Sequence, residues 1–367
     1  MHEFGRMGVI DLFSGSGGLS LGFKRAGFKI TAAVELNPQA AETYRKNFHR
    51  TRVFEQNITS IKGSKLLDNA ASQGVHETIV IGGPPCQPYS VANKQNNGDD
   101  HPYASSVTHY SRLVREIRPS AFLFENVVSF RHLEGWDRFL EDFRRAGYKV
   151  SFTGLRSSQF GIPQDRYRLF VTGFLNGHGF DISTLTVNGN GHYLSVKDAI
   201  WGLPELPESG GGQTRIPHPR KAKSQYSRML MGNTARLYNH WATTHSEEVV
   251  KTISCIRQGK SLLDMWQELP RSVRSRFKNK DALHTNIYKR LSWRKISPTI
   301  VHVRRAMLLH PVEDRIISVR EAARLQSFPD AFRFYGGWDR EYQQVADAVP
   351  PLLSAHIAKC FRKVFTN

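Results

Sequence analysis

The stretch Val9–Gly18, VIDLFSGSGG, decides the fold. Its apolar half, Val9–Phe13, predicts a buried strand, and its glycine-rich half, Asp11–Gly18, leads directly into a helical pattern at Leu19–Ala26. Glycines between a strand and a helix let the backbone turn tightly and come close to a ligand at the helix N-terminus. Because no Gly-Lys-Ser/Thr follows, a phosphate-binding P-loop is disfavoured, whereas the turn of a Rossmann oxidoreductase stays open.

Outward from this stretch, short apolar runs alternate with helical patterns over the first 175 residues. Three further runs predict buried strands: Ile30–Glu35, Thr78–Gly83 and Ala121–Val127. Helices are predicted at 38–48, 105–117 and 136–146. We therefore expect an α/β fold with a mostly parallel sheet covered by helices on both faces. Two later β-like runs, 148–155 and 168–174, predict an antiparallel pair at the edge of the sheet.

The alternation ends at a Gly- and Asn-rich linker, residues 176–191. No strand–helix rhythm follows between about residues 190 and 340, so we expect a second, irregular domain there. Near the C-terminus, Pro350-Pro351 is typical of the first turn of a helix. Leu353, Ile357 and Phe361 then share one apolar face, which predicts a final amphipathic helix.

The charge of the chain indicates a polyanionic partner. The sequence contains 51 Lys and Arg against 32 Asp and Glu, a net charge of +19. The excess is concentrated, since residues 208–305 hold 20 of the basic residues and only 6 of the acidic ones. This stretch lies outside the segments that carry the candidate catalytic residues.

Several classes are excluded by what the sequence lacks. No apolar run approaches 18 residues and no apolar signal region opens the chain, so we expect neither a membrane span nor secretion, and a cytoplasmic protein. The three cysteines, Cys86, Cys255 and Cys360, are far apart, which excludes a disulfide framework and a CxxC-type zinc site. We expect no metal.

The segment GGPPCQPYS, residues 82–90, carries a candidate nucleophile. It follows a predicted strand, and open α/β sheets react at the carboxyl ends of their strands. Two prolines stiffen the approach to Cys86, whereas Cys255 and Cys360 fit the usual role of a lone cysteine as a small buried hydrophobe. The polar stretch that follows, residues 92–102, has the composition of a mobile lid.

Charged residues at other strand ends complete the candidate site. Glu35 follows the glycines by about 20 residues, where nucleotide-binding folds place a carboxylate on ribose hydroxyls; a solvated carboxylate is the alternative. Burial raises a carboxyl pKa, so Glu125 is a candidate general acid, with a structural carboxylate as the alternative. Arg166 and Arg168 in QDRYR share a face and are candidate donors to a base carbonyl or a phosphate; a surface arginine pair is the alternative.

Six motifs in this order resemble the cytosine carbon-5 DNA methyltransferases that use S-adenosylmethionine. The motifs are DLFSGSGG at 11–18, GGPPCQPYS at 82–90, ENV at 125–127, QDRYR at 164–168, REAARLQSFPD at 320–330 and VADAVPP at 345–351. Together they span nearly the whole chain. The family's variable target-recognition region lies between the fourth and fifth motifs, which is the stretch that holds the excess positive charge here.

The resemblance implies the architecture and the partners. It implies a Rossmann-like S-adenosylmethionine methyltransferase fold plus a smaller irregular target-recognition domain. The catalytic and cofactor-binding domain would be residues 1–190 completed by 342–367, and the DNA-binding domain 191–341. The substrate would be double-stranded DNA and the second product S-adenosylhomocysteine. The compact length fits a prokaryotic restriction–modification enzyme, monomeric and nucleoid-associated, with a cognate endonuclease acting separately.

The resemblance also assigns catalytic roles. Cys86 would attack carbon 6 of cytosine, and Glu125 would protonate or hydrogen-bond ring nitrogen 3. Arg168 would hold the exocyclic oxygen, with Arg166 beside it. Because a base inside a duplex cannot be reached, the nucleotide must flip out, and Gln87 and Ser90 would lie near it or its phosphate.

For the cofactor, the resemblance implies a loop that wraps methionine and adenosine, formed by Phe13, Gly15, Gly17, Gly18 and Leu19. Glu35 would bind the ribose hydroxyls, Leu36 would pack on adenine, and the same pocket would include Asn57, Ile58, Pro84, Asp347 and Ala348. Two departures stand out. The family usually has Asp where this chain has Asn57, and Gly-Asn where it has Ala346-Asp347.

In the recognition region, a dense basic run is expected to contact DNA phosphates: Arg271, Arg274, Arg276, Lys278 and Lys280. Three alternatives stay open. A branch of this family methylates tRNA, and a non-catalytic DNA-binding relative would keep the fold without the chemistry. A Rossmann oxidoreductase would leave GGPPCQ and ENV unexplained.

Overall fold

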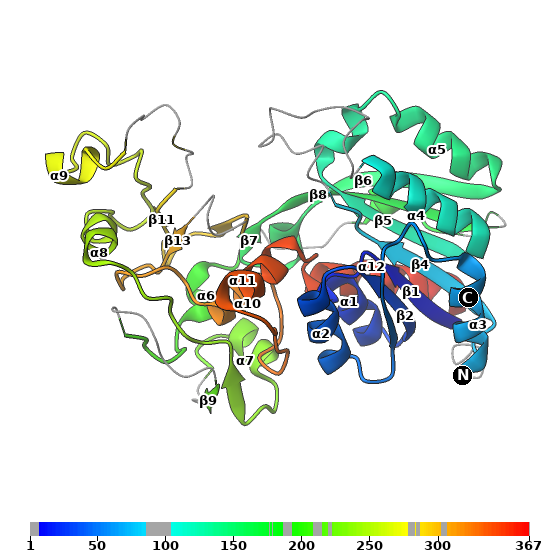
Figure 1. Cartoon of the computed structure of the whole chain (residues 1–367), viewed down its shortest axis with the longest axis horizontal. Coiled ribbons are helices and arrows are strands. Elements are labelled where there is room, and N and C mark those ends of the chain that lie inside the picture. The colour runs from blue at the N-terminus through cyan, green and yellow to red at the C-terminus, as the bar shows by residue number, and fades with distance from the viewer. Residues whose placement is uncertain are drawn as a thin grey trace. The chain divides into compact units, whose positions relative to one another are not determined.

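In a computed structural model of the chain, the described residues are 7–85, 104–175, 177, 179–185, 193–207, 215–218, 222–277, 283, 287–301 and 307–366. The chain divides into two compact units (Figure 1). Unit 1 comprises Met1–Phe160, Tyr167–Asn188 and Ala348–Asn367, and unit 2 comprises Gly161–Arg166 and Gly189–Asp347. The chain therefore passes between the units at 160/161, 166/167, 188/189 and 347/348.

Unit 1 is built on a seven-stranded sheet of order β3-β2-β1-β4-β5-β8-β6. The strands are β1 Met7–Leu12, β2 Lys29–Glu35, β3 Arg52–Glu55, β4 Glu77–Gly82, β5 Ala121–Asn126, β6 Tyr148–Arg156 and β8 Tyr167–Leu175. The first five are parallel, while β8 is antiparallel to both β5 and β6. The predicted α/β fold and the antiparallel pair at the sheet edge are confirmed.

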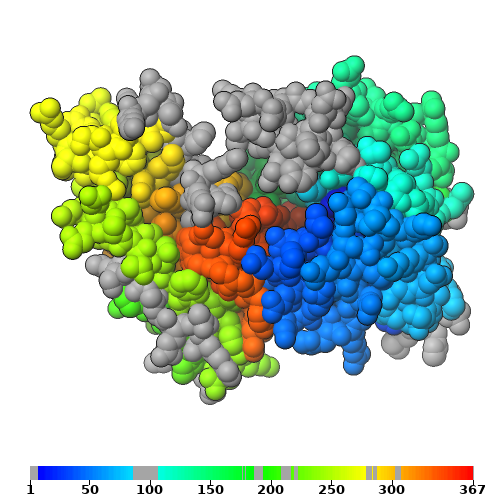
Figure 2. Space-filling model, in the orientation of Figure 1, coloured from blue at the N-terminus to red at the C-terminus, as the bar shows by residue number. Residues whose placement is uncertain are grey.

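Helices cover both faces of this sheet. They are α1 Gly18–Arg25, α2 Pro38–Asn47, α3 Gly63–Ser72, α4 Ala104–Ile117, α5 Trp136–Arg145 and α12 Pro351–Thr366. On one face α1 packs against α12, where the rings of Phe23 and Phe361 meet edge to face at 5.5 Å. In the view of Figure 2, the blue side chains of the N-terminal part of the chain form one continuous surface of unit 1.

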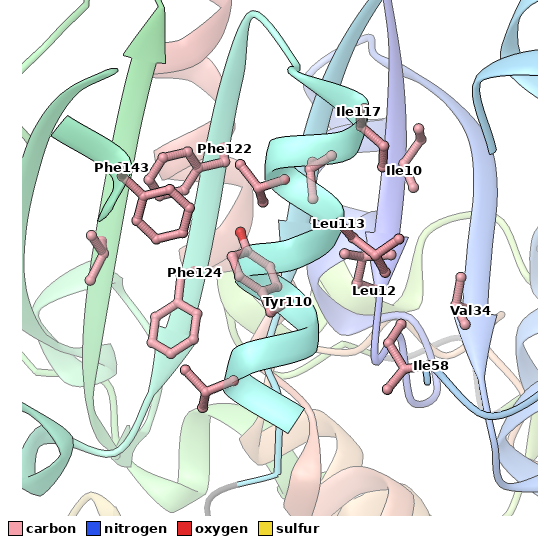
Figure 3. Packing of buried hydrophobic residues seen from close by; sticks show 14 of the residues in the cluster. Ile10, Leu12, Val34, Ile58, Tyr110, Leu113, Ile117, Phe122, Phe124 and Phe143 are labelled. Carbon is pink, nitrogen blue, oxygen red and sulfur yellow. The ribbon is translucent and has the colours of Figure 1, made fainter. Parts of the chain in front are cut away.

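The opposite face of the sheet carries the main apolar core (Figure 3). Alternate residues of a strand point to the same face, so Phe122 and Phe124 of β5 both meet this core. Tyr110 of α4 packs against Phe124 and its hydroxyl donates to the carbonyl of Leu123 at 2.9 Å, while Leu113 of the same helix lies toward Leu12 of β1. This packing fixes where β4 and β5 end, which is where the candidate site begins.

The described residues of unit 2 form short elements and no large sheet, in line with the irregular second domain that the sequence predicts. Its helices are α6 Val196–Ile200, α7 Gln225–Met231, α8 Glu247–Ser254, α9 Arg271–Arg274, α10 Val319–Leu325 and α11 Trp338–Asp347. Its strands form pairs of two or three residues: β9 Arg215–Pro217 with β10 Arg236–Tyr238, β11 Lys289–Arg290 with β13 Leu308–Leu309, and β7 Gln164–Asp165 with β12 Ser297–Pro298.

Buried ion pairs stabilise this irregular unit. Arg315 and Glu321 form a two-pronged pair at 2.8 Å for each bond, and both side chains are almost fully buried. Arg324 makes a similar pair with Asp330, while Arg320 donates to three backbone carbonyls. The segment 320–330 thus has a structural role in unit 2. No helix in the described part of the chain is long and apolar enough to cross a membrane.

Candidate active site

The loop between β1 and α1 has a shape that requires glycine. Gly15 and Gly17 adopt φ of +53° and +96°, a region that favours glycine. A Cβ on Gly17 would lie 2.5 Å from the ring of Phe48, and one on Gly18 would lie 2.3 Å from the carbonyl oxygen of Val349. The loop therefore presents bare backbone at the carboxyl end of β1, and Val349 packs directly on its last glycine.

Glu35 closes this loop from the end of β2. Its carboxylate accepts the amide N–H of Gly15 and that of Asn37, each at 2.8 Å. A carboxylate oxygen can accept more than one hydrogen bond, so a carboxylate at this place is suited to bind ribose hydroxyls. The next residue, Leu36, is 61% exposed, an unusual position for a large apolar side chain and one that suits the face of an adenine ring.

The remaining cofactor candidates in unit 1 lie at strand ends or in loops. Ile58 is buried, and the side-chain carbonyl of the exposed Asn57 accepts the amide N–H of Thr59 at 3.0 Å. Pro84 follows β4, and Ala348 precedes Val349. The exposed side chain of Leu36, the carboxylate of Glu35 and the bare glycine backbone fit an adenosine-containing cofactor, so these residues are compatible with S-adenosylmethionine.

Asp11 is a buried acid beneath the same loop that the sequence reasoning did not single out. Its carboxylate accepts the hydroxyl of Ser20 at 2.6 Å, and Ser20 in turn accepts the hydroxyl of Tyr44 at 2.5 Å. Loss of solvation raises the pKa of Asp11 to about 7. An acidic residue inside the apolar run VIDLF was the available signal.

Glu125 and Arg168 meet at the end of β5. The Nε atom of Arg168 lies 3.3 Å from Oε1 of Glu125, and the two side chains are 17% and 10% exposed. Their strands are antiparallel neighbours, so the pair is held by the sheet itself. This arrangement supplies a carboxyl group and a fixed cation side by side at the carboxyl end of the parallel strands, as the sequence predicts.

The chain that leads to Cys86 lies against this pair. A Cβ on Gly83 would be 2.8 Å from Oε2 of Glu125, and the Asn126 side chain donates to the carbonyl oxygen of Pro84 at 3.3 Å. Only Pro85 separates this contact from Cys86. The candidates Cys86, Gln87 and Ser90 themselves lie outside the described residues.

Arg166 has different partners from Arg168. It is 3% exposed and donates through Nη1 to the carbonyl of Ala346 at 2.8 Å and through Nη2 to that of Asp347 at 3.4 Å. The Asp347 carboxylate accepts the side-chain amide of Gln343, one helical turn earlier, at 2.5 Å. Of the two arginines of QDRYR, Arg166 thus binds backbone carbonyls at the end of α11, whereas Arg168 lies beside Glu125.

The DNA-binding candidates also divide. Arg271 and Arg274 belong to the short helix α9, whereas Arg276 contacts α8. Arg276 donates to the backbone carbonyl of Glu248 and, at 2.7 Å, to the hydroxyl of Thr252. Lys278 and Lys280 lie outside the described residues. Among the residues that the structure describes, no group of three His, Cys, Asp or Glu could hold a metal ion.

Comparison with known proteins identifies the family of the chain. A model of the family described as C-5 cytosine-specific DNA methylase matches residues 7–363. The type II methyltransferase M1.HphI of Haemophilus parahaemolyticus is 34% identical over 363 residues, covering 98% of this chain and 87% of that protein. The type II methyltransferase M.DdeI of Desulfomicrobium norvegicum is 29% identical over 382 aligned positions, covering 98% and 90%.

Solved structures agree as well. A prophage-encoded E. coli protein, assigned as a DNA modification methyltransferase, matches with a TM-score of 0.77 and 25% identity over 98% of this chain and 100% of that chain. The resemblance inferred from the six motifs is therefore confirmed. The chain belongs to the C-5 cytosine-specific DNA methylase family.

Proposed function

We propose that this protein transfers a methyl group from S-adenosylmethionine to carbon 5 of cytosine in a specific double-stranded DNA sequence. The observation that carries the proposal is the Glu125–Arg168 pair, because Gly83, three residues before Cys86, lies directly against the Glu125 carboxyl group. A carboxyl group, a cation and a cysteine at one strand end are the groups that activation of a cytosine ring requires.

The chemistry begins with addition of the Cys86 thiolate to carbon 6 of a cytosine that has flipped out of the duplex. Glu125 supplies a proton or hydrogen bond to ring nitrogen 3, which neutralises the negative charge that develops on that nitrogen during the addition. Arg168 donates to the exocyclic oxygen and keeps the Glu125 carboxyl oriented. Carbon 5 becomes nucleophilic and takes up the methyl group.

Completion of the reaction restores the aromatic ring. A base removes the proton from carbon 5, the bond between Cys86 and carbon 6 breaks, and the free thiolate is regenerated. Bound S-adenosylmethionine supplies the electrophilic methyl group. The loop from Phe13 to Gly18 would hold it, with Glu35 accepting its ribose hydroxyls and Leu36 packed on its adenine.

We further propose that residues 1–190 with 342–367 carry this chemistry and that 191–341 select the DNA sequence. The concentration of positive charge in 208–305 supports a nucleic-acid contact in that region. Similarity to type II methyltransferases over 98% of the chain supports a role in restriction–modification, with a cognate endonuclease acting separately.

A covalent trap tests this proposal. Fluorine at carbon 5 cannot leave as a proton, so methylation of 5-fluorocytosine stops before Cys86 is released. We expect the protein, incubated with S-adenosylmethionine and DNA amplified with 5-fluorodeoxycytidine triphosphate, to form an adduct that survives denaturing electrophoresis. Cys86→Ala should form none, whereas the matched control Cys255→Ala, altered at the end of α8, should react fully.

Two results of the trap would count against the proposal. An adduct that forms equally with Cys86→Ala would remove Cys86 as the nucleophile. Absence of any adduct with DNA, together with adduct on tRNA transcribed with 5-fluorocytidine triphosphate, would replace DNA by tRNA as the substrate.

A further inference from the structure

Buried side chains bind the last carbonyls of α11. The last carbonyls of a helix lack partners within the helix and are usually satisfied by the residues that follow. Here Pro350 and Pro351 follow closely and have no N–H to offer. The carbonyls of Ala346 and Asp347 are instead bound by the guanidinium group of Arg166.

A second buried side chain binds the preceding carbonyl. The amide of Gln326 donates to the carbonyl oxygen of Val345 at 2.5 Å, and its own oxygen accepts the amide of Gln164 at 3.0 Å. Gln164 and Gln326 are fully buried. Three successive carbonyls at the end of α11 are therefore bound by the side chains of Arg166 and Gln326. Gln164, two residues before Arg166, in turn binds Gln326.

Arginine suits this position for two reasons. Its fork-shaped guanidinium group can donate to two neighbouring oxygens at once, which a lysine ammonium cannot do with the same geometry. Its positive charge also lies at the negative end of the dipole of α11, where a cation is favourable. Since Arg166 is 3% exposed, both effects act with little solvent screening.

The chain links this cap to the glycine loop. Asp347 is joined through Ala348 to Val349, whose carbonyl oxygen packs against Gly18 within unit 1. On the other side, Arg166 is followed at once by β8, which carries Arg168 beside Glu125. Arg166 is therefore the last residue of unit 2 before the chain enters unit 1. It binds the carbonyl of Asp347, which is the last residue of unit 2 before the chain enters unit 1 again.

We propose that Arg166 is a positioning residue for cofactor binding: it caps α11 and so fixes the segment 348–349 that lines the glycine loop. This role differs from direct contact with the target base, and it rests on the proposed use of S-adenosylmethionine. It predicts that loss of the guanidinium fork weakens cofactor binding more than it slows the chemical step.

The test compares Arg166→Lys with Arg168→Lys and with Arg145→Lys, which alters an exposed arginine of α5. S-adenosylhomocysteine is titrated calorimetrically, and kcat is measured at saturating S-adenosylmethionine. Charge-assisted hydrogen bonds of this kind predict about a tenfold or larger rise in Kd for Arg166→Lys, with a smaller change in kcat. Arg168→Lys should show the reverse pattern, and Arg145→Lys should match the wild type.

A second readout needs no cofactor. Amide hydrogen exchange of the ligand-free protein should be faster at residues 344–349 in Arg166→Lys and unchanged there in Arg168→Lys, because only the first frays the end of α11. If the wild type does not bind S-adenosylhomocysteine, the proposed function fails, while the exchange rates still decide whether Arg166 caps the helix.

The proposal is overturned by one clear pattern. In this pattern, Arg166→Lys leaves the Kd for S-adenosylhomocysteine and the amide exchange of residues 344–349 unchanged, but lowers kcat as much as Arg168→Lys does. Arg166 would then act on the reacting base, beside Arg168.

Discussion

The carboxyl group of Asp11 is fully buried at the end of β1, just before the glycine loop. One oxygen accepts the hydroxyl of Ser20, and the other has no hydrogen-bond partner among the described residues. A buried carboxylate without full compensation is costly, which is why its pKa rises to about 7. The acid that begins the DLFSGSGG motif is thus neutral over part of the physiological pH range.

This residue predicts a pH dependence of folding stability. Between pH 4 and 7 the folded protein keeps the proton on Asp11 and the unfolded chain releases it, so the free energy of unfolding falls as pH rises. Asp11→Asn removes this titration. From pH 5 to pH 7 we expect the wild type to lose about 2 kcal/mol relative to Asp11→Asn.

Urea unfolding at several pH values measures this difference. Glu341, whose pKa burial also raises to about 7, titrates alike in both proteins and cancels. A stability difference between Asp11→Asn and wild type that stays constant from pH 5 to pH 7 would contradict the account.

At the scale of elements, α10 shows how unit 2 is held together without a large sheet. Ser318 caps the helix by accepting the amide N–H of Glu321 at 3.1 Å, and the Glu321 carboxylate accepts the amide N–H of Ser318 at 2.7 Å. The same carboxylate pairs with Arg315, which keeps the pKa of Glu321 far below its usual range despite its burial. One side chain therefore serves both the helix cap and the buried ion pair.

Glu321→Gln should consequently destabilise the protein strongly. The substitution removes one of the two carboxylates that pair with the buried Arg315 guanidinium, the other being that of Glu313. Breaking a buried pair from one side costs about 3–5 kcal/mol. Glu141→Gln, which breaks the exposed pair with Arg145 on α5, should cost less than about 1 kcal/mol. Equal losses in chemical denaturation of the two variants would show that the buried pair is not what stabilises this unit.

Features that depend on residues close together in the sequence could be predicted, whereas contacts between residues far apart in the sequence could not. The strands of VIDLF and AFLFENV were predictable because strands buried on both faces are continuous apolar runs. The resemblance assigned Glu125 and Arg168 to one cytosine ring, but that their strands β5 and β8 are neighbours was seen only in the structure. The partners of Arg166 could not be predicted, because Ala346 and Asp347 lie 180 and 181 residues further along the chain. Strand β3 was missed, since its four residues are mostly exposed at the sheet edge.

For the whole molecule, the net charge of +19 is the dominant electrostatic feature. A protein that neutralises DNA phosphates releases bound counterions, so its affinity falls as salt rises, with a slope set by the number of phosphate contacts. The positive charge is concentrated in residues 208–305. Within the predicted DNA-contacting run, Arg271 and Arg274 lie on α9, whereas Arg276 binds α8.

The double variant Arg271→Ala/Arg274→Ala should therefore weaken DNA binding on all sequences alike. The slope of log K against log salt should become shallower by about 2. The matched control Arg144→Ala/Arg145→Ala removes the same charge from α5 in unit 1. Identical slopes for the two double variants would mean that net charge, and not α9, determines the contact.

The central claim is tested most directly by reading cytosine methylation in living cells. The protein and its Cys86→Ala variant would be expressed separately in a bacterial strain without cytosine methylation, and the genomes sequenced for methylated bases. We predict 5-methylcytosine at nearly every copy of one short sequence in cells with the wild type, and none with Cys86→Ala. A genome without 5-methylcytosine despite soluble wild-type protein, or the same methylation with Cys86→Ala, would contradict the account.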